Sequence, residues 1–332
     1  MNKTVISILK ILEKHQNEVI GSREISRQLQ LYGVDLTERT VRYHLRIMDE
    51  RGLTTVHGKE GRQITEKGLE ELKRSDVSER VGFIISKIES LSYQSTFDIN
   101  TMQGQVVLNV SFFEPESIAS AMKELKGVFS SPYVMSDRVF VAHEGQSIGD
   151  VIVPEGMVGL GTLCSVTING ILLKHGIPVT SRYGGVVEVS NSGQNMRFTS
   201  LISYEGSSLD PLIVFIKSGM TSVNDTVQKG RGMILASFRE IPVVCAEEAR
   251  RLQEKMRAMG ILGLHSVGMP NQPLFEVPVG TDKVGLMVVG GLNPIAALEE
   301  LGINTQSKAM SVMMDYKDLT PFSEVARQFT AS

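Results

Sequence analysis

The chain has 332 residues, of which 42% are apolar, an ordinary globular composition with room for two or three domains. It has no uninterrupted apolar run long enough to cross a membrane, and its first residues form a charged helix pattern rather than a secretory signal. Its two cysteines, Cys164 and Cys245, are not in a paired spacing, which argues against a disulfide framework or structural zinc site and favours the cytoplasm.

Charge is distributed unevenly along the chain. The formal net charge is −3, but residues 1–75 carry 14 Lys or Arg against 11 Asp or Glu, and the remainder carries 20 against 26. The opposite signs suggest that the two parts of the chain bind different partners.

Three short amphipathic helices are predicted in close order, over residues 4–15, 22–30 and 37–52. Ser22 and Thr37 are candidate N-caps of the second and third helices, and the third closes on a glycine. The spacing predicts a compact helical unit.

The third helix has two distinct faces. Val41, Leu45 and Met48 share one narrow arc, which predicts the buried face. Candidate DNA-contacting residues on the rest of the helix are Arg39, Thr40, Arg42, Tyr43 and Arg46. Arginine presents a planar fork of donors that suits phosphates and guanine edges, so this face is typical of a groove-reading helix.

A basic hairpin is predicted after the third helix. Residues 53–65 read as two short strands around a glycine-bounded turn, with Lys59 and Arg62 near its tip. Three helices and a basic hairpin are the order of a winged helix-turn-helix. The alternative is a small helical domain with a solvated charged face. The agreement of spacing, apolar arc and hairpin favours double-stranded DNA as the partner of residues 1–75.

Residues 76–94 are predicted to form a helical connector. A polar helix over 65–75 precedes an apolar stripe within 78–91. Because the stripe lasts only about three turns, a helix docked on the body is favoured over a free coiled coil.

From about residue 95 the chain repeats itself, which predicts a duplicated regulatory domain over 95–332. Residues 158–177 and 284–303 share six of twenty positions at an offset of 126. The same offset aligns 104–114 with 230–240, where four of eleven positions match. The two copies are assigned to about 95–190 and 221–316.

Each copy reads as strand, helix, strand, strand, helix, strand. The first copy is expected at about 105–113, 116–126, 138–142, 158–163, 168–175 and 185–190. The second is expected at about 232–239, 245–259, 274–278, 284–289, 294–301 and 310–316. Two further strand-like runs lie within 196–217. The predicted fold class is α+β, with two split βαββαβ units that are either separate or merged into one sheet.

Each copy places a loop of small residues between a strand and a short helix, at 161–165 and 288–291. Thr167 and Asn293 are equivalent and are both good N-cap residues, and Pro294 suits the first helical position. The two helices are therefore expected to begin near residues 168 and 294.

A helix N-terminus flanked by small residues is a candidate anion site, because its N–H groups are free. The candidate ligand-binding residues here are Thr162, Cys164, Ser165, Thr167, Gly290, Gly291 and Asn293. The alternative is that the glycines only allow a helix to pack closely on a strand. Arg182, before a double glycine, is a further candidate for a carboxylate, and Lys308 has the same standing; the alternative is a surface arginine before a turn.

No catalytic motif is found. HExxH, a GxGxxG opening a βαβ unit and a Walker lysine motif are absent from the sequence, and no GxSxG nucleophile elbow is assigned. The six histidines are scattered without metal-ligand spacing, so neither a catalytic residue nor a metal or cofactor site is assigned.

The residues resemble those of a known family. TERTVRYHLRIMDERGL resembles the winged-helix domain named after ribonuclease R. VGLGTLCSVTINGILLKHGIPVTSRYGGVVEV and DPLIVFIKSGMTSV resemble the regulatory domain of the NrpR nitrogen-regulation repressors, and GIPVTSRYGG is the most specific part. The resemblance implies a repressor of nitrogen-assimilation genes that binds operator DNA as a homodimer and is released by 2-oxoglutarate.

The implied effector fits the duplicated body, because 2-oxoglutarate has two carboxylates and the body offers two helix N-termini. The hypothesis is that it binds between the copies, near 162–167 and 290–293. The alternatives are a winged-helix regulator of another small anion or amino acid, and an enzyme fused to a winged-helix adaptor.

Overall fold

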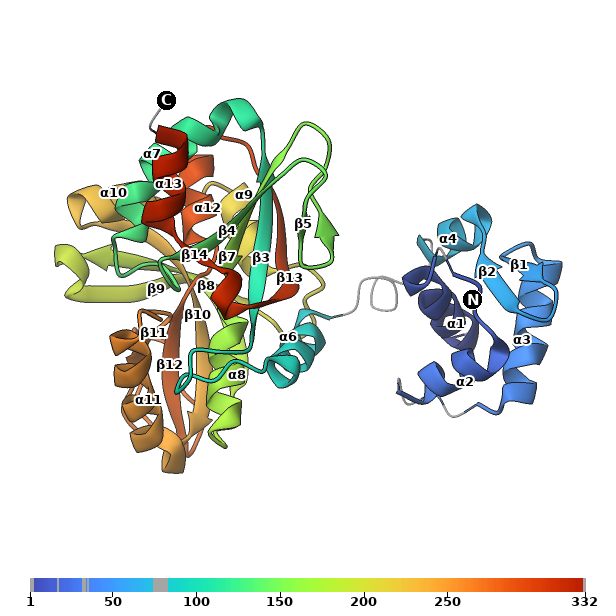
Figure 1. Cartoon of the computed structure of the whole chain (residues 1–332). Helices are drawn as coiled ribbons and strands as arrows, with labels where there is room; N and C mark the ends of the chain where they lie inside the picture. The colour runs from blue at the N-terminus through green and yellow to red at the C-terminus, as the bar shows by residue number, and fades with distance from the viewer. Residues whose placement is uncertain (1–2, 17, 32–33, 35, 74–82, 331–332) are drawn as a thin grey trace. The chain divides into compact units, whose positions relative to one another are not determined.

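The chain divides into two compact units, residues 1–82 and 83–332. The computed structural model describes residues 3–16, 18–31, 34, 36–73 and 83–330 (Figure 1). The predicted connector is split by this division: residues 76–82 lie outside the described residues, and the described part of the predicted helix belongs to the second unit.

The first unit has the predicted order of three helices, a hairpin and a fourth helix. Its elements are α1 (Lys3–Lys14), α2 (Ser22–Leu31), α3 (Glu38–Glu50), β1 (Thr54–His57), β2 (Gly61–Ile64) and α4 (Glu66–Lys73). β1 and β2 pair antiparallel, and a single bridge joins Ile20 to Arg62. The apolar arc of α3 is buried, as predicted from its spacing: Val41, Leu45 and Met48 have no exposed surface.

The ends of α3 follow from local chemistry. Thr37 is the N-cap, as predicted, and its hydroxyl accepts a hydrogen bond from the backbone N–H of Thr40. Gly52, just past the C-cap, has a φ of +69°, which glycine adopts without the strain that a side chain adds. Ser22 is the first residue of α2, and its hydroxyl donates to Oε1 of Glu38 at 3.0 Å.

The second unit contains two five-stranded sheets and a small hairpin of β5 and β6. Its helices are α6 (Ile84–Gln94), α7 (Ile118–Phe129), α8 (Val166–Lys174), α9 (Pro211–Lys217), α10 (Val223–Lys229), α11 (Ala246–Ala258), α12 (Asn293–Glu300) and α13 (Phe322–Thr330). Its strands are β3 (Gln105–Phe113), β4 (Arg138–His143), β5 (Ser147–Ile148), β6 (Val151–Ile152), β7 (Val158–Leu163), β8 (Thr180–Ser190), β9 (Asn195–Ser203), β10 (Gly232–Pro242), β11 (Leu264–Val267), β12 (Lys283–Val289), β13 (Gln306–Asp315) and β14 (Thr320–Pro321). Short 3₁₀ turns lie at Pro115–Ser117, Asn191–Gly193, Val243–Cys245 and Tyr316–Asp318.

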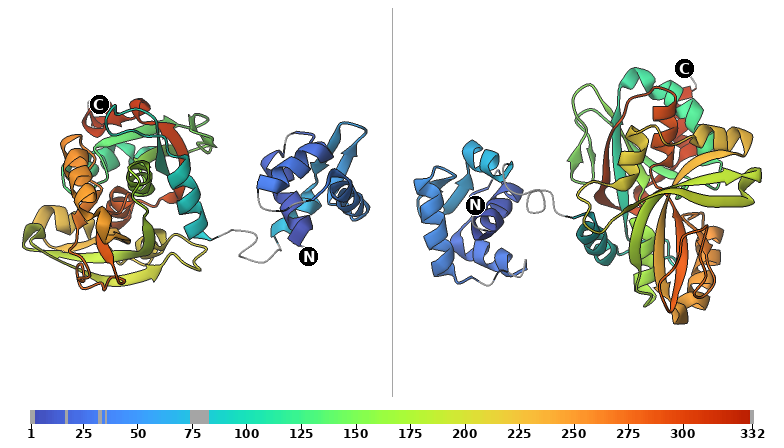
Figure 2. Two further views of the ribbon diagram at one scale, coloured as in Figure 1. Left: turned by 90° about the horizontal axis from the view of Figure 1, so that it is seen from below. Right: turned by 180° about the vertical axis from the view of Figure 1, so that it is seen from behind.

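The two predicted copies, about 95–190 and 221–316, are the two halves of the body, and the last strand of each half lies in the sheet of the other. One sheet has the order β13-β3-β7-β4-β14, and the other has the order β11-β12-β10-β8-β9. β13 therefore completes the sheet of β3, and β8 completes the sheet of β10. The helices follow the strands: α12 packs with α7, and α8 shares a core with α11 (Figures 1 and 2).

Two predicted elements of the body are wrong. The strand expected at 274–278 is a turn, because Phe275 and Glu276 have positive φ values, and the corresponding strand is β11 at Leu264–Val267. The second strand-like run within 196–217 is the helix α9. Asp210 caps this helix and Pro211 occupies its first turn, which are helix-start signals that outweigh an apolar run.

The predicted offset of 126 residues does not hold for the first elements of the two predicted copies. α7 begins at Ile118 and α11 at Ala246, 128 residues apart, whereas β4 and β11 begin 126 residues apart. The ungapped alignment of 104–114 with 230–240 is therefore displaced by two residues. This matters for the site below, because the structural counterpart of Arg239 is Ser111 rather than Phe113.

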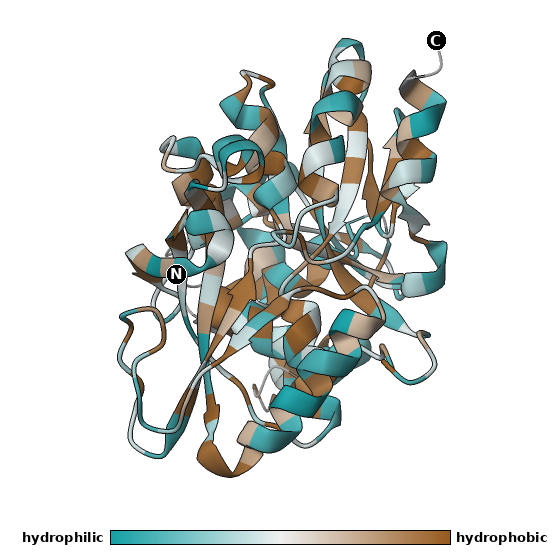
Figure 3. Cartoon of the chain, turned by 90° about the vertical axis from the view of Figure 1, so that its left-hand side faces the viewer, coloured by the Kyte–Doolittle hydropathy of each residue, from teal (hydrophilic) through white to brown (hydrophobic). Residues whose placement is uncertain are grey.

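The core explains why these elements pack together. The strands of the body are largely apolar, and its surface helices have one apolar and one polar face (Figure 3). In the part of the chain that the structure describes, no helix has the length and hydropathy needed to cross a membrane.

Candidate functional site

The outer face of α3 presents the predicted DNA-contacting side chains. Arg39, Arg42, Tyr43 and Arg46 are exposed, and Tyr43 keeps 63% of its surface. Arg42 pairs with Glu38, and Nε of Arg46 lies 3.2 Å from Oε1 of Glu50. No ion pair involves Arg39 among the described residues. Of the predicted DNA-contacting side chains on this face, Arg39 and Tyr43 are therefore the most accessible to a ligand.

Thr40 and Arg62 have structural partners. The hydroxyl of Thr40 lies 2.9 Å from that of Thr37, within the helix cap. Nε of Arg62 lies 2.9 Å from Oδ2 of Asp49, and both side chains are four-fifths buried. This pair joins β2 to α3, whereas Lys59 in the turn of the hairpin is exposed. Lys59 is thus the better placed of the two basic residues for a phosphate.

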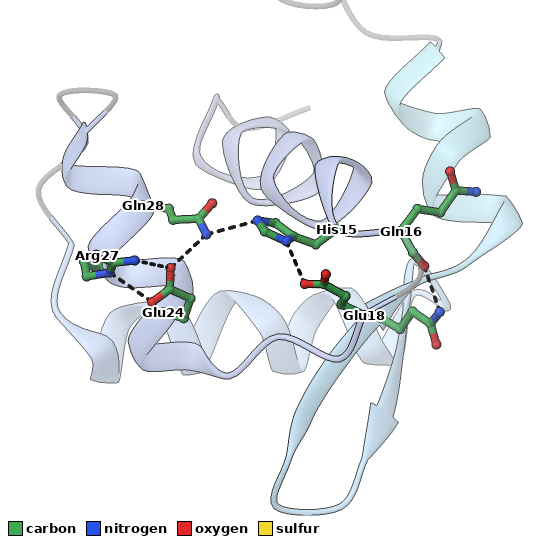
Figure 4. A network of polar contacts seen from close by, with 7 residues as sticks. His15, Gln16, Glu18, Glu24, Arg27 and Gln28 are labelled. Carbon is green, nitrogen blue, oxygen red and sulfur yellow. Dashed lines mark hydrogen bonds and ion pairs between the residues drawn. The ribbon is translucent and has the colours of Figure 1, made fainter. Parts of the chain in front are cut away.

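A polar network joins His15, just past the end of α1, to α2 (Figure 4). Nδ1 of His15 lies 3.0 Å from Glu18, and its Nε2 lies 3.1 Å from Nε2 of Gln28. Arg27 and Gln28 both donate to Glu24, and these hydrogen bonds lower the pKa of Glu24 to about 2. The network therefore gives α2, which precedes α3, a defined position on α1.

In the body, the two predicted glycine loops contact each other. The hydroxyl of Thr162 donates to the backbone oxygen of Gly291 at 2.9 Å. A Cβ on Gly291 would lie 2.3 Å from the carbonyl oxygen of Leu163, and one on Gly290 would lie 2.7 Å from Cβ of Leu235. Close packing is thus sufficient to explain both glycines.

Thr167 and Asn293 are not N-caps, which corrects the prediction. α8 begins at Val166 and α12 at Asn293, so both side chains lie in the first turn of their helix. The Thr167 hydroxyl accepts from the N–H of Val107, and Oδ1 of Asn293 accepts from the N–H of Leu235. Both side chains are buried and fix a helix to a strand.

The start of α8 faces a buried arginine that sequence reasoning did not single out. Arg239 lies in β10, the central strand of its sheet, and is 2% exposed. Its Nη1 donates to the backbone oxygen of Ser165 at 3.0 Å and to Oδ1 of Asn169. Its Nε has no hydrogen-bond partner. A buried cation with an unsatisfied donor is costly unless an anion completes it.

The groups around Arg239 form a pocket that we call the Arg239 pocket. It is lined by Asn109, Cys164, Ser165, Tyr204, Asp210, Arg239, Gly291, Leu292, Met310 and the three apolar residues Ile88, Val166 and Leu212. Its cavity has a volume of about 10 Å³, room for about one water molecule. Burial lowers the pKa of Arg239 to about 10 and raises the pKa of Cys164 to about 11. The guanidinium is therefore charged at neutral pH and the thiol is not.

Asp210 adds a carboxylate to the same pocket. Its Oδ1 accepts the N–H of Leu212 at 2.7 Å, and loss of hydration raises its pKa to about 6. Burial also raises the pKa of Tyr204, so the phenol stays protonated. At neutral pH the pocket holds one cation and one carboxylate that is close to its pKa.

Arg182 lies in a separate, larger cavity of about 700 Å³. This second cavity, between α6, α8, β8 and β9, is lined by Ile88, Asn169, Ser181 and Arg182 among others. Nε of Arg182 is 3.6 Å from Oε2 of the buried Glu240. Asn169 connects the two cavities, since its Nδ2 donates to Ser181 at 3.0 Å while its Oδ1 accepts from Arg239.

Two signals in the sequence point to this site. One is the charged pair Arg239-Glu240 in the otherwise largely apolar strand run ILASFREIP. The other is the difference between the halves, since Arg239 and Asn169 correspond to Ser111 and Ile295 at the structural offsets. The polar set therefore occurs once in the body. Among the described residues, no group of three His, Cys, Asp or Glu is arranged to hold a metal ion.

Comparison with known proteins gives two matches to family models. Residues 81–321 match the model of NrpR regulatory domains 1 and 2, and residues 6–72 match the ribonuclease R winged-helix domain.

Curated relatives carry the same name. A global nitrogen regulator NrpRI from Methanosarcina mazei is 37% identical over 96% of this chain and 98% of its own length. The NrpR proteins of Methanococcus maripaludis and Methanocaldococcus jannaschii are 31% and 34% identical, over 95% and 90% of this chain. The chain spans 54% and 51% of the length of these two.

A solved structure has the same fold over most of the chain. The crystal structure of a nitrogen repressor-like protein from Methanococcus jannaschii superposes with a TM-score of 0.62 and 28% identity. The match covers 72% of this chain and 98% of that one.

Proposed function

The chain belongs to the NrpR family of nitrogen regulators, and we propose that it is a cytoplasmic repressor of nitrogen-assimilation genes. It binds operator DNA as a homodimer, through α3 and the wing, which is the hairpin of β1 and β2. It is released from the DNA when 2-oxoglutarate binds the body. The printed names of the relatives and the winged-helix match support the regulatory part of this proposal.

The observation that carries the effector part is the unsatisfied guanidinium of Arg239 at the start of α8. A carboxylate is the natural partner of a buried guanidinium, and the positive end of the dipole of α8 lies at the same place. The repeated element order supports an origin of the body by duplication. Arg239, Ser165 and Asn169 come together once in the body, so we expect one 2-oxoglutarate per chain.

Structure shifts the proposed role of several predicted effector residues. Thr162, Gly290 and Gly291 have packing roles where the two loops meet, and Thr167 and Asn293 each fix a helix to a strand. Arg239 and the first turn of α8 would bind one carboxylate, beside Cys164 and Ser165. Arg182, in the neighbouring cavity, remains a candidate for the second carboxylate.

Calorimetry with 2-oxoglutarate, and with glutamate and oxaloacetate as controls, tests the proposal directly. We expect selective, saturable heat with a stoichiometry of one per chain. Arg239→Gln should abolish the heat, whereas Arg251→Gln, an exposed arginine on α11, should not change it. Equal binding by the Arg239→Gln protein would exclude the Arg239 pocket as the effector site.

The DNA part is tested with duplexes that the protein itself enriches from a randomised pool. Adding 2-oxoglutarate should release the wild-type protein from an enriched duplex and leave the Arg239→Gln protein bound. Chemical conversion of 2-oxoglutarate during incubation would instead favour an enzyme.

A further inference from the structure

We infer that α6 is a lid on the Arg239 pocket and that its displacement transmits effector binding to the winged-helix unit. This inference rests on the proposed function, because it concerns how the proposed effector reaches its site.

The size of the pocket requires an opening. A cavity of about 10 Å³ cannot hold a five-carbon dicarboxylate, whereas the second cavity beside it has a volume of about 700 Å³. Ile88 of α6 lines both cavities and is 4% exposed. A ligand that passes from the large cavity to Arg239 must therefore displace Ile88 and with it α6.

The C-terminal end of α6 is held firmly. A Cβ on Gly170 of α8 would lie 2.8 Å from Cβ of Ser95, so the helices are in close contact there. The Ser95 hydroxyl donates to the backbone oxygen of Gln105 at 2.9 Å, and Lys174 donates to that of Thr96. These contacts make the C-terminal end the natural pivot.

The N-terminal end of α6 is held by two tethers. The N–H of Ile84 donates to the backbone oxygen of Ser207 at 2.9 Å, and Nζ of Lys87 lies 3.4 Å from that of Ala309. The segments that carry these acceptors also supply the pocket with Asp210 and Met310.

Met310, which packs against α6, has a strained backbone. It has a φ of +48° in an irregularity of β13, where the register with β3 shifts between Lys308 and Val312. Its side chain is 2% exposed and packs in one cluster with Ile88. A ligand that pushes this segment aside loosens the acceptor of Lys87 in the same step.

The position of α6 in the chain makes this movement consequential. It is the first helix of the second unit, so its N-terminal end is where the chain leaves the body toward the winged helix. Binding that favours a displaced α6 then changes the constraint on the DNA-binding unit. An effector shifts such an equilibrium only through its different affinity for the two states.

Hydrogen exchange on the full-length wild-type protein is the first test, with and without saturating 2-oxoglutarate. We expect the amides of residues 88–94, which are hydrogen-bonded within α6, to exchange at least about tenfold faster with the effector bound, as a helix that undocks loses its tertiary protection. Unchanged or increased protection of α6, in a sample where calorimetry shows binding, would overturn the lid.

A pair of variants on α6 is the second test. Ile88→Ala weakens the seal, so DNA release should need about 5- to 10-fold less 2-oxoglutarate, a coupling of ordinary size. Tyr93→Ala is the matched control, because Tyr93 is 82% exposed and lines neither cavity. Identical release curves for the two variants, with 2-oxoglutarate still bound, would overturn the lid and leave the proposed function standing. A wild-type protein that gives no heat with 2-oxoglutarate would overturn both.

Discussion

Thr167 and Asn293 form the same hydrogen-bonded clip in the two halves of the body. Thr167 joins the first turn of α8 to both the N–H and the carbonyl oxygen of Val107, at 3.1 and 3.3 Å. Asn293 joins the first turn of α12 to the same two groups of Leu235, at 2.8 and 3.1 Å. Both clips lie at the point where the halves exchange elements, so each fixes a crossing helix to the first strand of its own half.

Removing a clip should destabilise the body. Asn293→Ala leaves buried groups of Leu235 and Tyr133 without a partner, so we expect a loss of about 2–4 kcal/mol in unfolding free energy. Thr167→Val should cost about 1–2 kcal/mol, because fewer groups are left unsatisfied. Denaturant unfolding measures both. Asn195→Ala, at an exposed strand position, is the control, and equal stability of all three proteins would contradict the clip.

Substitutions at the two ends of α3 should have opposite effects on DNA affinity. Arg39→Ala should weaken DNA binding by about 1–3 kcal/mol, since an exposed arginine in the groove contacts a base edge or phosphate. Glu50→Gln should strengthen binding a few-fold, because it frees Arg46 from its ion pair and removes a negative charge from the DNA side. Fluorescence anisotropy with an enriched duplex tests both. A weaker complex with Glu50→Gln would show that α3 is oriented differently on DNA.

Substitutions of the two basic residues in the hairpin of β1 and β2, Lys59 and Arg62, should have different effects: one on DNA affinity and the other on stability. Lys59→Gln should reduce the slope of log affinity against log salt by about one, with no change in unfolding, as expected for one lost phosphate contact. Arg62→Gln should instead lower the stability of the winged-helix unit by about 1–3 kcal/mol, because the largely buried Asp49 loses its largely buried partner. If Arg62→Gln unfolds like the wild type and only binds DNA less well, Arg62 contacts DNA as the sequence suggests.

Effector affinity should fall as pH rises. Burial raises the pKa of Asp210 to about 6, above its ordinary value, so below pH 6 this carboxyl is neutral and does not repel a bound carboxylate. As pH rises through 6 to 8 the carboxylate forms, and calorimetry should show weaker 2-oxoglutarate binding. The other titratable groups of the pocket keep their charge over this range, because the pKa of Arg239 is about 10, that of Cys164 about 11 and that of Tyr204 raised.

Asp210→Asn is the control for this pH dependence, since an amide can still cap α9. Its affinity should stay constant between pH 5.5 and 8. Relative to the wild type, the same substitution should raise the unfolding free energy more at pH 7 than at pH 5. A carboxyl whose pKa is raised in the folded state destabilises the fold fully above that pKa, and the effect declines as pH falls from there toward the ordinary pKa of an aspartate. A wild-type affinity that is independent of pH would exclude Asp210 as a neighbour of the bound anion.

Local sequence determined the winged-helix unit. Its helices are short and amphipathic, with a cap at Thr37 and a positive-φ glycine at Gly52, and these signals act within a few residues of one another. For the same reason the buried arc and exposed face of α3 followed from spacing alone. Pattern along the chain also predicted most helices and strands of the body, but it misplaced the strand β11 and predicted a strand where the helix α9 lies.

The tertiary structure alone decided how the two halves combine and which residues surround the proposed ligand site. Strand exchange brings α8 next to β10 and α12 to the side of the body that contains β3. Arg239 therefore meets Ser165 and Asn169, which are 74 and 70 residues away in the sequence. No local pattern encodes such pairings. In the folded body, Thr167 and Asn293 bond to strands instead of capping helices, and Arg239 is buried in a largely apolar strand. The physical reason is burial: a guanidinium acquires a need for an anion only when the fold removes its water, and that depends on residues far away in sequence.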